Sequence, residues 1–196
     1  MSHSASPPAP TVQSAILSRY VLNGKPSGKV EIATFASGCF WGAEYIFIRH
    51  FSRADGLIKS TVGYTGGLTE NPSYEDVCSG NTGHAEAVKI EFDPALVSYA
   101  ELVEFFFRTH DPIAVNRQGG DWGRHRSAIF CHTSEQLEIA GRVKTEVQKA
   151  YFDPKGGIID TWIEGAGAWW DAEAQHQRHL FNNPDESQPS THRLHW

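Results

Sequence analysis

The sequence predicts one two-layer α+β domain in which helices cover one face of a sheet. Segments with strand periodicity and segments with helix periodicity follow one another in mixed order, and no internal repeat is present. With 196 residues, 40% hydrophobic and 20% charged, the chain is long enough for one core and short for two. We therefore expect a single domain over residues 27–196.

The first 26 residues differ in composition from the rest of the chain. The opening MSHSASPPAPTVQS is rich in Ser, Pro and Ala, a composition that buries little apolar surface. We predict that residues 1–26 form a flexible arm that carries no chemistry.

The first half of the domain is predicted to contain three strands and two helices. A turn at Ser37-Gly38 separates the first strand from the first helix, and Ser98-Tyr-Ala-Glu101 has the capping-box pattern that begins the second helix. In chain order we expect a strand over 30–36, a helix over 39–51, strands over 60–67 and 85–93, and a helix over 98–110.

The second half is predicted to continue in the same manner. Thr133-x-x-Gln136 has the pattern of a helix start, because a threonine hydroxyl can accept the N–H three residues later. We expect a strand over 127–132, a helix over 133–151, a strand over 157–165 and a last helix over 169–181.

The charge balance argues against nucleic acid or membrane as a partner. The chain has 17 Lys and Arg against 23 Asp and Glu, a net charge of −6, whereas phosphate backbones and anionic lipids attract clusters of basic residues. No apolar run approaches the ~20 residues of a membrane span, and the N-terminus lacks the layout of a signal peptide. We expect a cytoplasmic monomer that acts on a neutral or small substrate.

Cys39 lies at the predicted boundary between a strand and a helix, in the stretch 37-SGCFWGAEY-45. In the first turn of a helix, free backbone N–H groups and the positive end of the macrodipole favour thiolate over thiol. This position makes Cys39 a candidate nucleophile, although a cysteine there is also typical of core packing. Phe40 and Trp41 are compatible both with core and with a substrate pocket.

The chain resembles one family over most of its length, from about residue 29 to the C-terminus. GCFWG at 38–42 resembles the active-site signature of the A-type peptide methionine sulfoxide reductases, and the resemblance implies a ferredoxin-like α/β roll. The further matching segments are VGYTGG at 62–67, NPSYEDVCSGNTGHAEAV at 71–88, HDP at 110–112, NRQGGDWG at 116–123, RSAIF at 126–130, His176-Gln177 and THRLHW at 191–196.

The resemblance implies catalytic roles for four residues. Cys39 corresponds to the nucleophile that attacks the sulfur of a methionine sulfoxide, and Glu86 corresponds to the general acid that protonates the sulfoxide oxygen. Tyr74 corresponds to a tyrosine whose hydroxyl hydrogen-bonds that oxygen. Asp121 corresponds to a carboxylate on a loop beside the site.

The resemblance also implies the substrate, the cofactor requirement and the reductant. Phe40 and Trp41 would hold the terminal methyl group of a methionine S-sulfoxide, free or within a protein. The reaction would leave a sulfenic acid on Cys39, which a thiol must reduce, with thioredoxin, glutaredoxin or glutathione as reductant. No metal or organic cofactor is required.

Two departures from the family pattern concern the donor tyrosine and recycling. The family usually has D-x-G-x-x-Y-R-S where this chain has 121-DWGRHRS-127, so the tyrosine is missing. His125 is the nearest substitute and would either bind the substrate oxygen or point to solvent. The family often has a resolving cysteine before T-H-R-L, and 184-PDESQPSTHRLHW-196 has none. Cys78 is then a possible internal resolving cysteine, and Cys131 is expected to be packed in the core.

The three cysteines and ten histidines leave two other readings open. An odd number of cysteines without C-x-x-C fits a reducing compartment better than a disulfide framework. Pairs such as His176-x-x-His179, His192-x-x-His195 and Cys131-His132 would suit a metal-binding protein, and a chelator would test this. A protein that recognises sulfoxides with little turnover is the other alternative, and a single-turnover assay would test it.

Overall fold

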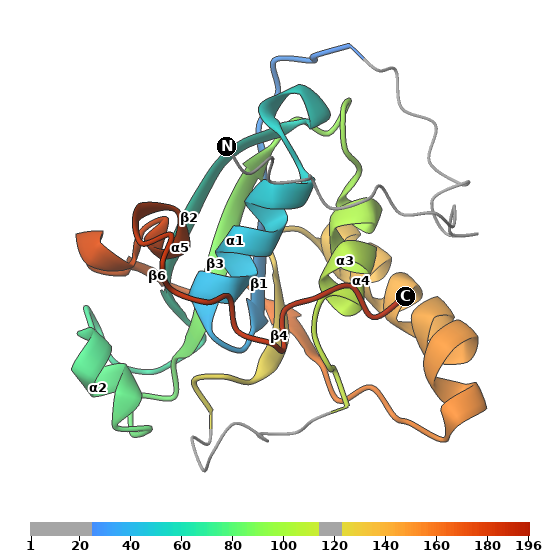
Figure 1. Ribbon diagram of the computed structural model, residues 1–196. Helices are drawn as coiled ribbons and strands as arrows, with labels where there is room; N and C mark the ends of the chain where they lie inside the picture. Colours follow the sequence, from blue (N-terminus) through green and yellow to red (C-terminus); the bar gives the residue numbers. More distant parts are fainter. Residues whose placement is uncertain (1–24, 114–122) are drawn as a thin grey trace.

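A six-stranded sheet with the strand order β5-β4-β1-β3-β2-β6 forms the centre of the protein in a computed structural model (Figure 1). The structure describes residues 25–113 and 123–196. The predicted arm over 1–26 therefore lies almost entirely outside the described residues. The strands are β1 (Glu31–Ser37), β2 (Leu57–Thr65), β3 (Ala85–Phe92), β4 (Ser127–Cys131), β5 (Trp162–Gly165) and β6 (Trp169–Asp171).

Helices connect these strands, and the longest of them lie over one side of the sheet in Figure 1. The α-helices are α1 (Phe40–His50), α2 (Tyr74–Cys78), α3 (Tyr99–Arg108), α4 (Ser134–Val147) and α5 (His179–Asn182). A π-helical turn, η3 (Gln148–Phe152), continues α4, and the short 3-10 helices are η2 (Arg53–Asp55), η4 (Asp153–Lys155) and η5 (Ala174–His176).

The strand pairing brings the ends of several strands to one place. β1 is antiparallel to β3 and β4, and β2 is antiparallel to β3 and β6, whereas β5 is parallel to β4. In this register Phe35 lies opposite Val88 and Ile129, and Tyr64 lies opposite Glu86. The end of β1 therefore meets the beginning of β3, the beginning of β4 and the end of β2.

The two faces of the sheet bury different side chains, as period-2 alternation requires. Ala33 and Phe35 point into a large core shared with α1, α3 and α4, where the Phe35 ring stacks on Phe47 at 5.4 Å and on Phe106 at 5.2 Å. The opposite face carries a small cluster of Ala36, Ala85, Ala87, Ala128 and Phe130, against which Ala166 and Trp169 pack. This division agrees with the predicted two-layer α+β arrangement.

The predicted helix starts of α3 and α4 are confirmed. The Ser98 hydroxyl accepts the N–H of Glu101, and the Thr133 hydroxyl accepts the N–H of Gln136. The Gln136 side chain extends away from the helix and donates to the Ile32 carbonyl at 2.8 Å. It therefore fastens α4 to the first strand.

The predicted helix over 169–181 is wrong, because its first residues form β6 and pair with β2. At Gly63 an added Cβ would lie 2.3 Å from the Trp170 carbonyl, so glycine is required for the two strands to approach. The Gln177 side chain then exchanges two hydrogen bonds with the backbone of Val62. Arg178 has φ +54, which interrupts helical geometry before the short α5. The predicted strand over 157–165 is also shorter, since only its last four residues form β5.

Candidate functional site

Cys39 is the N-cap residue of α1, directly after the turn that follows β1. Gly38 has φ +95, a left-handed conformation that side chains disfavour, and it lets the chain reverse within one residue. The Ala43 N–H donates to the Cys39 carbonyl, which closes the first turn of the helix. The thiol is half-buried and unpaired with another cysteine. The predicted strand-to-helix position of Cys39 is confirmed.

Glu86 lies beside this turn, with its side chain 2% exposed. One carboxylate oxygen, Oε2, accepts the N–H of Phe40 at 3.0 Å. This N–H belongs to the first turn of α1, where backbone donors have no acceptor within the helix. The Glu86 N–H in turn donates to the Arg124 carbonyl at 2.8 Å. The start of one helix and the start of one strand thus bring together Phe40 and Glu86, which are 46 positions apart in the sequence.

Arg124 and His125 approach the other carboxylate oxygen of Glu86. Oε1 lies 3.3 Å from Nε2 of His125 and 3.9 Å from Nε of Arg124. The side chains of His125 and Arg124 are only 13% and 19% exposed. His125 therefore points into the protein, toward the carboxylate, and not into solvent.

The thiol of Cys39 does not have the low pKa that its helix position alone predicts. Burial, followed by the negative charge of Glu86, raises the pKa of Cys39 from its ordinary 9.0 to about 11. The backbone N–H groups of Trp41 and Gly42 and the charge of Arg124 act in the opposite direction. The predicted helix effect is therefore present but is outweighed, because desolvation and a nearby carboxylate both disfavour a second negative charge.

The aromatic residues that follow Cys39 have different environments. Phe40 is 1% exposed, with its ring 5.9 Å from Tyr64 and 5.4 Å from His176. Trp41 is half-buried, donates its indole N–H to Nδ1 of His176 at 3.2 Å and stacks on His179 at 3.7 Å. Phe40 thus belongs to the core, and Trp41 forms part of its edge.

Glu173 and His176 hold this aromatic cluster together, and the sequence analysis assigned neither of them an individual role at the site. Glu173 accepts the hydroxyl of Tyr64 and the N–H of Tyr74, both at 2.8 Å. The His176 ring lies 4.6 Å from the ring of Tyr74 and 3.8 Å separates its Nε2 from Glu173. The only signal in the sequence was the pair His176-Gln177, whose spacing from Cys39 does not indicate contact.

Tyr74 and Cys78 lie one helical turn apart on α2. Burial, followed by a hydrogen bond with Cys78, raises the pKa of Tyr74 to about 12. The guanidinium of Arg124 donates from Nη1 to the Cys78 sulfur and lies 6.0 Å from the centre of the Tyr74 ring. Arg124 therefore links Cys78 and Tyr74 to Glu86.

The remaining sequence-predicted positions are placed as follows. Cys131 is 5% exposed and its sulfur lies 3.7 Å from the Tyr99 hydroxyl, so its predicted burial is confirmed. Asp121 lies outside the described residues. Within residues 25–113 and 123–196, no group of three or more His, Cys, Asp or Glu side chains is arranged to hold a metal ion. No helix in these ranges is long and apolar enough to cross a membrane.

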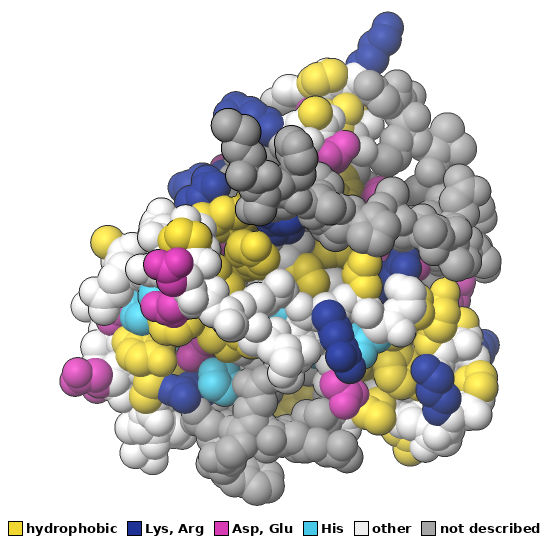
Figure 2. All heavy atoms as spheres, viewed as in Figure 1, with side chains coloured by type: hydrophobic (Ala, Val, Ile, Leu, Met, Phe, Trp, Pro, Cys, Tyr) yellow, Lys and Arg dark blue, Asp and Glu magenta, His cyan; other side chains and the backbone are white. Residues whose placement is uncertain are grey.

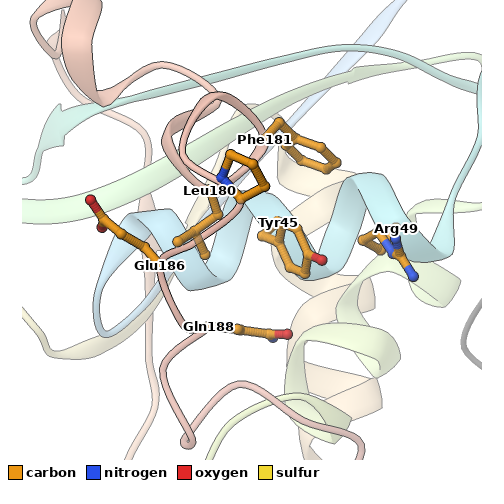
Figure 3. Close-up of a pocket in the computed structure, with 7 residues that line it drawn as sticks. Tyr45, Arg49, Leu180, Phe181, Glu186 and Gln188 are labelled. Atoms are coloured by element: carbon orange, nitrogen blue, oxygen red, sulfur yellow. The ribbon is translucent and has the colours of Figure 1, made fainter. Parts of the chain in front are cut away.

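A separate cavity of about 230 Å³ lies farther along α1 (Figure 3). Figure 3 shows that the side chains around it come from α1, α5 and the segment that follows α5. The Tyr45 ring lies 4.9 Å from Phe181 across it. Neither Cys39 nor Glu86 belongs to its lining, which comprises Tyr45, Arg49, Leu180, Phe181, Pro184, Glu186 and Gln188.

Comparison with known proteins gives a consistent result over most of the chain. Residues 31–194 match the family model of peptide methionine sulfoxide reductase. A protein of Schizosaccharomyces pombe described as a probable peptide methionine sulfoxide reductase is 49% identical over 168 residues, which cover 85% of this chain and 98% of that protein.

Solved structures agree with the sequence matches. The reduced form of Mxr1 from Saccharomyces cerevisiae superposes with a TM-score of 0.76 at 36% identity, over 86% of this chain and 93% of that one. Mxr1 in complex with Trx2 superposes with a TM-score of 0.56 at 30% identity, over 86% and 91% of the two chains.

The raised pKa of Cys39 predicts its pH-dependent reactivity. In a Cys78→Ser, Cys131→Ala protein, the alkylation rate of Cys39 by iodoacetamide should follow the thiolate fraction and rise with a midpoint near pH 11. Glu86→Gln should move the midpoint to lower pH because it removes one of the two causes of the raised pKa. Glu104→Gln, at a buried glutamate of α3, is the matched control and should leave the midpoint unchanged. A wild-type midpoint at the ordinary 9.0 would contradict the electrostatic account.

Proposed function

Because the chain belongs to the peptide methionine sulfoxide reductase family, we propose that it reduces methionine S-sulfoxide, free or in proteins, to methionine with Cys39 as nucleophile. The observation that carries this proposal is the hydrogen bond between the buried carboxylate of Glu86 and the Phe40 N–H, next to Cys39. This contact supports a site in which a thiol and a proton-carrying group act on one small substrate.

The proposed reaction transfers one oxygen atom from the substrate to Cys39. The thiol proton passes to Glu86, the Cys39 sulfur attacks the sulfoxide sulfur, and Glu86 protonates the sulfoxide oxygen. The attack forms a bond between the two sulfur atoms. This S–S bond and the S–O bond of the substrate then break as the protonated oxygen forms an S–O bond with the Cys39 sulfur. The products are a thioether and a sulfenic acid, so the Cys39 sulfur is oxidised by two electrons while the substrate sulfur is reduced by two.

Five further residues are proposed to complete the substrate site. Trp41 is proposed to contribute apolar surface for the methyl group, which its location at the edge of the aromatic cluster supports. Phe40, which is 1% exposed, is proposed to contribute to the apolar wall from behind this edge. Tyr74 and His125 lie close to the sulfoxide oxygen in this proposal. The approach of His125 to Glu86 supports it, as do the contacts of Arg124 with Glu86 and with Tyr74. Asp121 is proposed to contribute a carboxylate from the neighbouring loop.

A thiol from another molecule is proposed to recycle the sulfenic acid. A first thiol forms a mixed disulfide with Cys39 and releases water, and a second thiol then releases Cys39 as a disulfide forms between the reductant sulfurs. The complex of the relative Mxr1 with Trx2 supports a thioredoxin as reductant, and glutaredoxin or glutathione would supply the same chemistry. Cys78 is engaged by Arg124 and Tyr74, which disfavours its movement toward Cys39.

The remaining proposals concern the setting of the enzyme. Three free cysteines support a reducing, cytoplasmic location. The face shown in Figure 2 has Lys, Arg, Asp and Glu side chains interspersed among hydrophobic ones, which together with the net charge of −6 supports a protein without a nucleic-acid partner. The large exposed hydrophobic side chains of the described residues belong to different segments, which supports a monomer.

We also propose that the fold is a ferredoxin-like roll. Along the chain the core elements follow the order β1-α1-β2-β3-α3-β4, apart from the short α2 between β2 and β3. The central strands have the spatial order β4-β1-β3-β2, and each is antiparallel to its neighbours in this set, which supports this class.

The nucleophile is tested by substitution. Cys39→Ser should abolish single-turnover release of methionine from a methionine sulfoxide peptide, because a hydroxyl is a poor nucleophile toward sulfur. Cys131→Ala is the control and should retain release, since Cys131 is buried against Tyr99 away from Glu86. Substantial methionine formation by Cys39→Ser would contradict the proposed function.

Acid catalysis is tested by Glu86→Gln, which keeps the shape and the hydrogen bond to Phe40 but cannot deliver a proton. The single-turnover rate constant should fall by about 10²–10⁴ with a much smaller change in substrate affinity. Glu104→Gln should react at the wild-type rate. A Glu86→Gln protein that reacts normally would show that the proton comes from another group.

The recycling route is tested by mass after one equivalent of substrate without reductant. The external route predicts a protein heavier by one oxygen that reacts with a sulfenic-acid trap such as dimedone. Turnover with a small thiol should be unaffected by Cys78→Ser. A protein lighter by two hydrogens, with a Cys39–Cys78 peptide crosslink, would show the internal route instead.

A further inference from the structure

The cavity along α1 lies next to the aromatic edge that carries Trp41. Trp41, Tyr45 and Arg49 are spaced four residues apart, which places them on one face of α1. His179 stacks on Trp41 at 3.7 Å, and its Nε2 lies 2.9 Å from Oε2 of Glu186, which lines the cavity. Figure 3 shows Glu186 and Arg49 at opposite ends of the cavity. One imidazole therefore separates the proposed methyl-binding surface from this cavity.

The cavity has the size and the lining of a site for one apolar side chain. Its volume of about 230 Å³ is below the roughly 300–1,000 Å³ of pockets that enclose a whole ligand. The rings of Tyr45 and Phe181 lie 4.9 Å apart, so an aromatic or large aliphatic side chain between the walls would contact carbon on several sides. The apolar part of the lining consists of Tyr45, Leu180, Phe181 and Pro184.

The polar side chains of the lining are engaged by other groups of the protein. Glu186 pairs with His179, and the Arg49 guanidinium lies 5.7 Å from the centre of an aromatic ring. The Gln188 amide donates to the His192 carbonyl. An ionised ligand would have to compete with these contacts, whereas an apolar side chain leaves them in place. The lining therefore favours an apolar occupant.

A short stretch of extended peptide spans the distance from Trp41 to the cavity. With a rise of about 1.5 Å per residue, Tyr45 lies about 6 Å and Arg49 about 12 Å from Trp41 along the axis of α1. An extended chain advances about 3.3–3.6 Å per residue. A polypeptide whose methionine sulfoxide lies at Trp41 would therefore bring a side chain two to four positions away to the cavity.

We propose that this cavity is a subsite for an aromatic or large aliphatic side chain of a polypeptide substrate, two to four residues from the methionine sulfoxide. The inference rests on the proposed function and narrows its substrate class to polypeptides with such a residue. The subsite touches none of the reacting atoms, so it contributes binding energy equally before and during the reaction. It therefore lowers KM and leaves kcat nearly unchanged.

The first test is a competition between peptides. The host is an acetylated peptide of Ala and Ser with one central methionine S-sulfoxide, and each competitor carries Phe at one position from two to four residues before or after it. With dithiothreitol as reductant, the product ratio by mass spectrometry gives the ratio of the kcat/KM values. Phe at the matching position should raise kcat/KM about tenfold over the host, the order expected when part of an aromatic side chain is buried.

Substitutions in the lining test the location of the effect. Phe181→Ala and Tyr45→Ala, each checked for folding by its melting temperature, should bring the ratio for the Phe peptide over the host peptide close to one. Tyr45→Phe keeps the ring and should keep the ratio. Leu137→Ala, at an exposed apolar residue of α4, is the matched control and should also keep it.

A photocrosslink tests the location without changing the lining. The Phe of the preferred peptide is replaced by p-benzoylphenylalanine, and the peptide is irradiated with the Cys39→Ser protein, which leaves the sulfoxide intact. The peptide map should place the crosslink within residues 45–49 or 180–188. Crosslinks confined to other segments would overturn the inference.

The outcomes separate this inference from the proposed function. Methionine formation from every peptide with ratios near one at all positions would overturn the subsite alone. A tenfold ratio that persists in both Phe181→Ala and Tyr45→Ala would do the same. If none of the peptides yielded methionine, the proposed function would be overturned together with this inference.

Discussion

The hydrogen bond between Glu86 and the Phe40 N–H is the interaction on which the arrangement of the site depends. It joins the first residues of β3 to the first turn of α1, and it exists because β3 pairs with both β1 and β2. A shift of the β3 register by one residue would turn Glu86 to the other face of the sheet. The sheet pairing, and not the loops, therefore brings the thiol and the carboxyl to one point.

The same contact creates an electrostatic conflict that the surrounding residues moderate. Burial strengthens the interaction between Glu86 and its donors but also makes ionisation of Cys39 costly. Arg124 and the N–H groups of α1 reduce this cost only in part, since the pKa of Cys39 stays near 11. The thiol form of Cys39 is therefore favoured over the thiolate at neutral pH.

Much of this arrangement was accessible from the sequence, for identifiable reasons. Alternation of apolar residues predicted β1 to β4, and the hydroxyls of Ser98 and Thr133 predicted the starts of α3 and α4, because these signals are local. The matching motifs led to Cys39 and Glu86 as partners. The role of Glu173 was not predicted, since its partners, Tyr64 and Tyr74, lie about a hundred residues earlier in the chain. The strand β6 was not predicted because its pairing depends on Gly63, a small residue in a distant strand.

Each residue of the segment GCFWG has an identifiable structural role. Gly38 supplies the left-handed turn that ends β1, Cys39 caps α1, and Phe40 presents its N–H to Glu86. Trp41 extends to His176 and so connects the helix with the aromatic cluster. At Gly42 an added Cβ would lie 2.5 Å from Nδ1 of His192, so this glycine admits the C-terminal segment against α1. The motifs GCFWG and THRLHW, at opposite ends of the domain, are therefore in contact with each other. A side chain at position 42 would displace the C-terminal segment and so disturb the first turn of α1, where Cys39 lies.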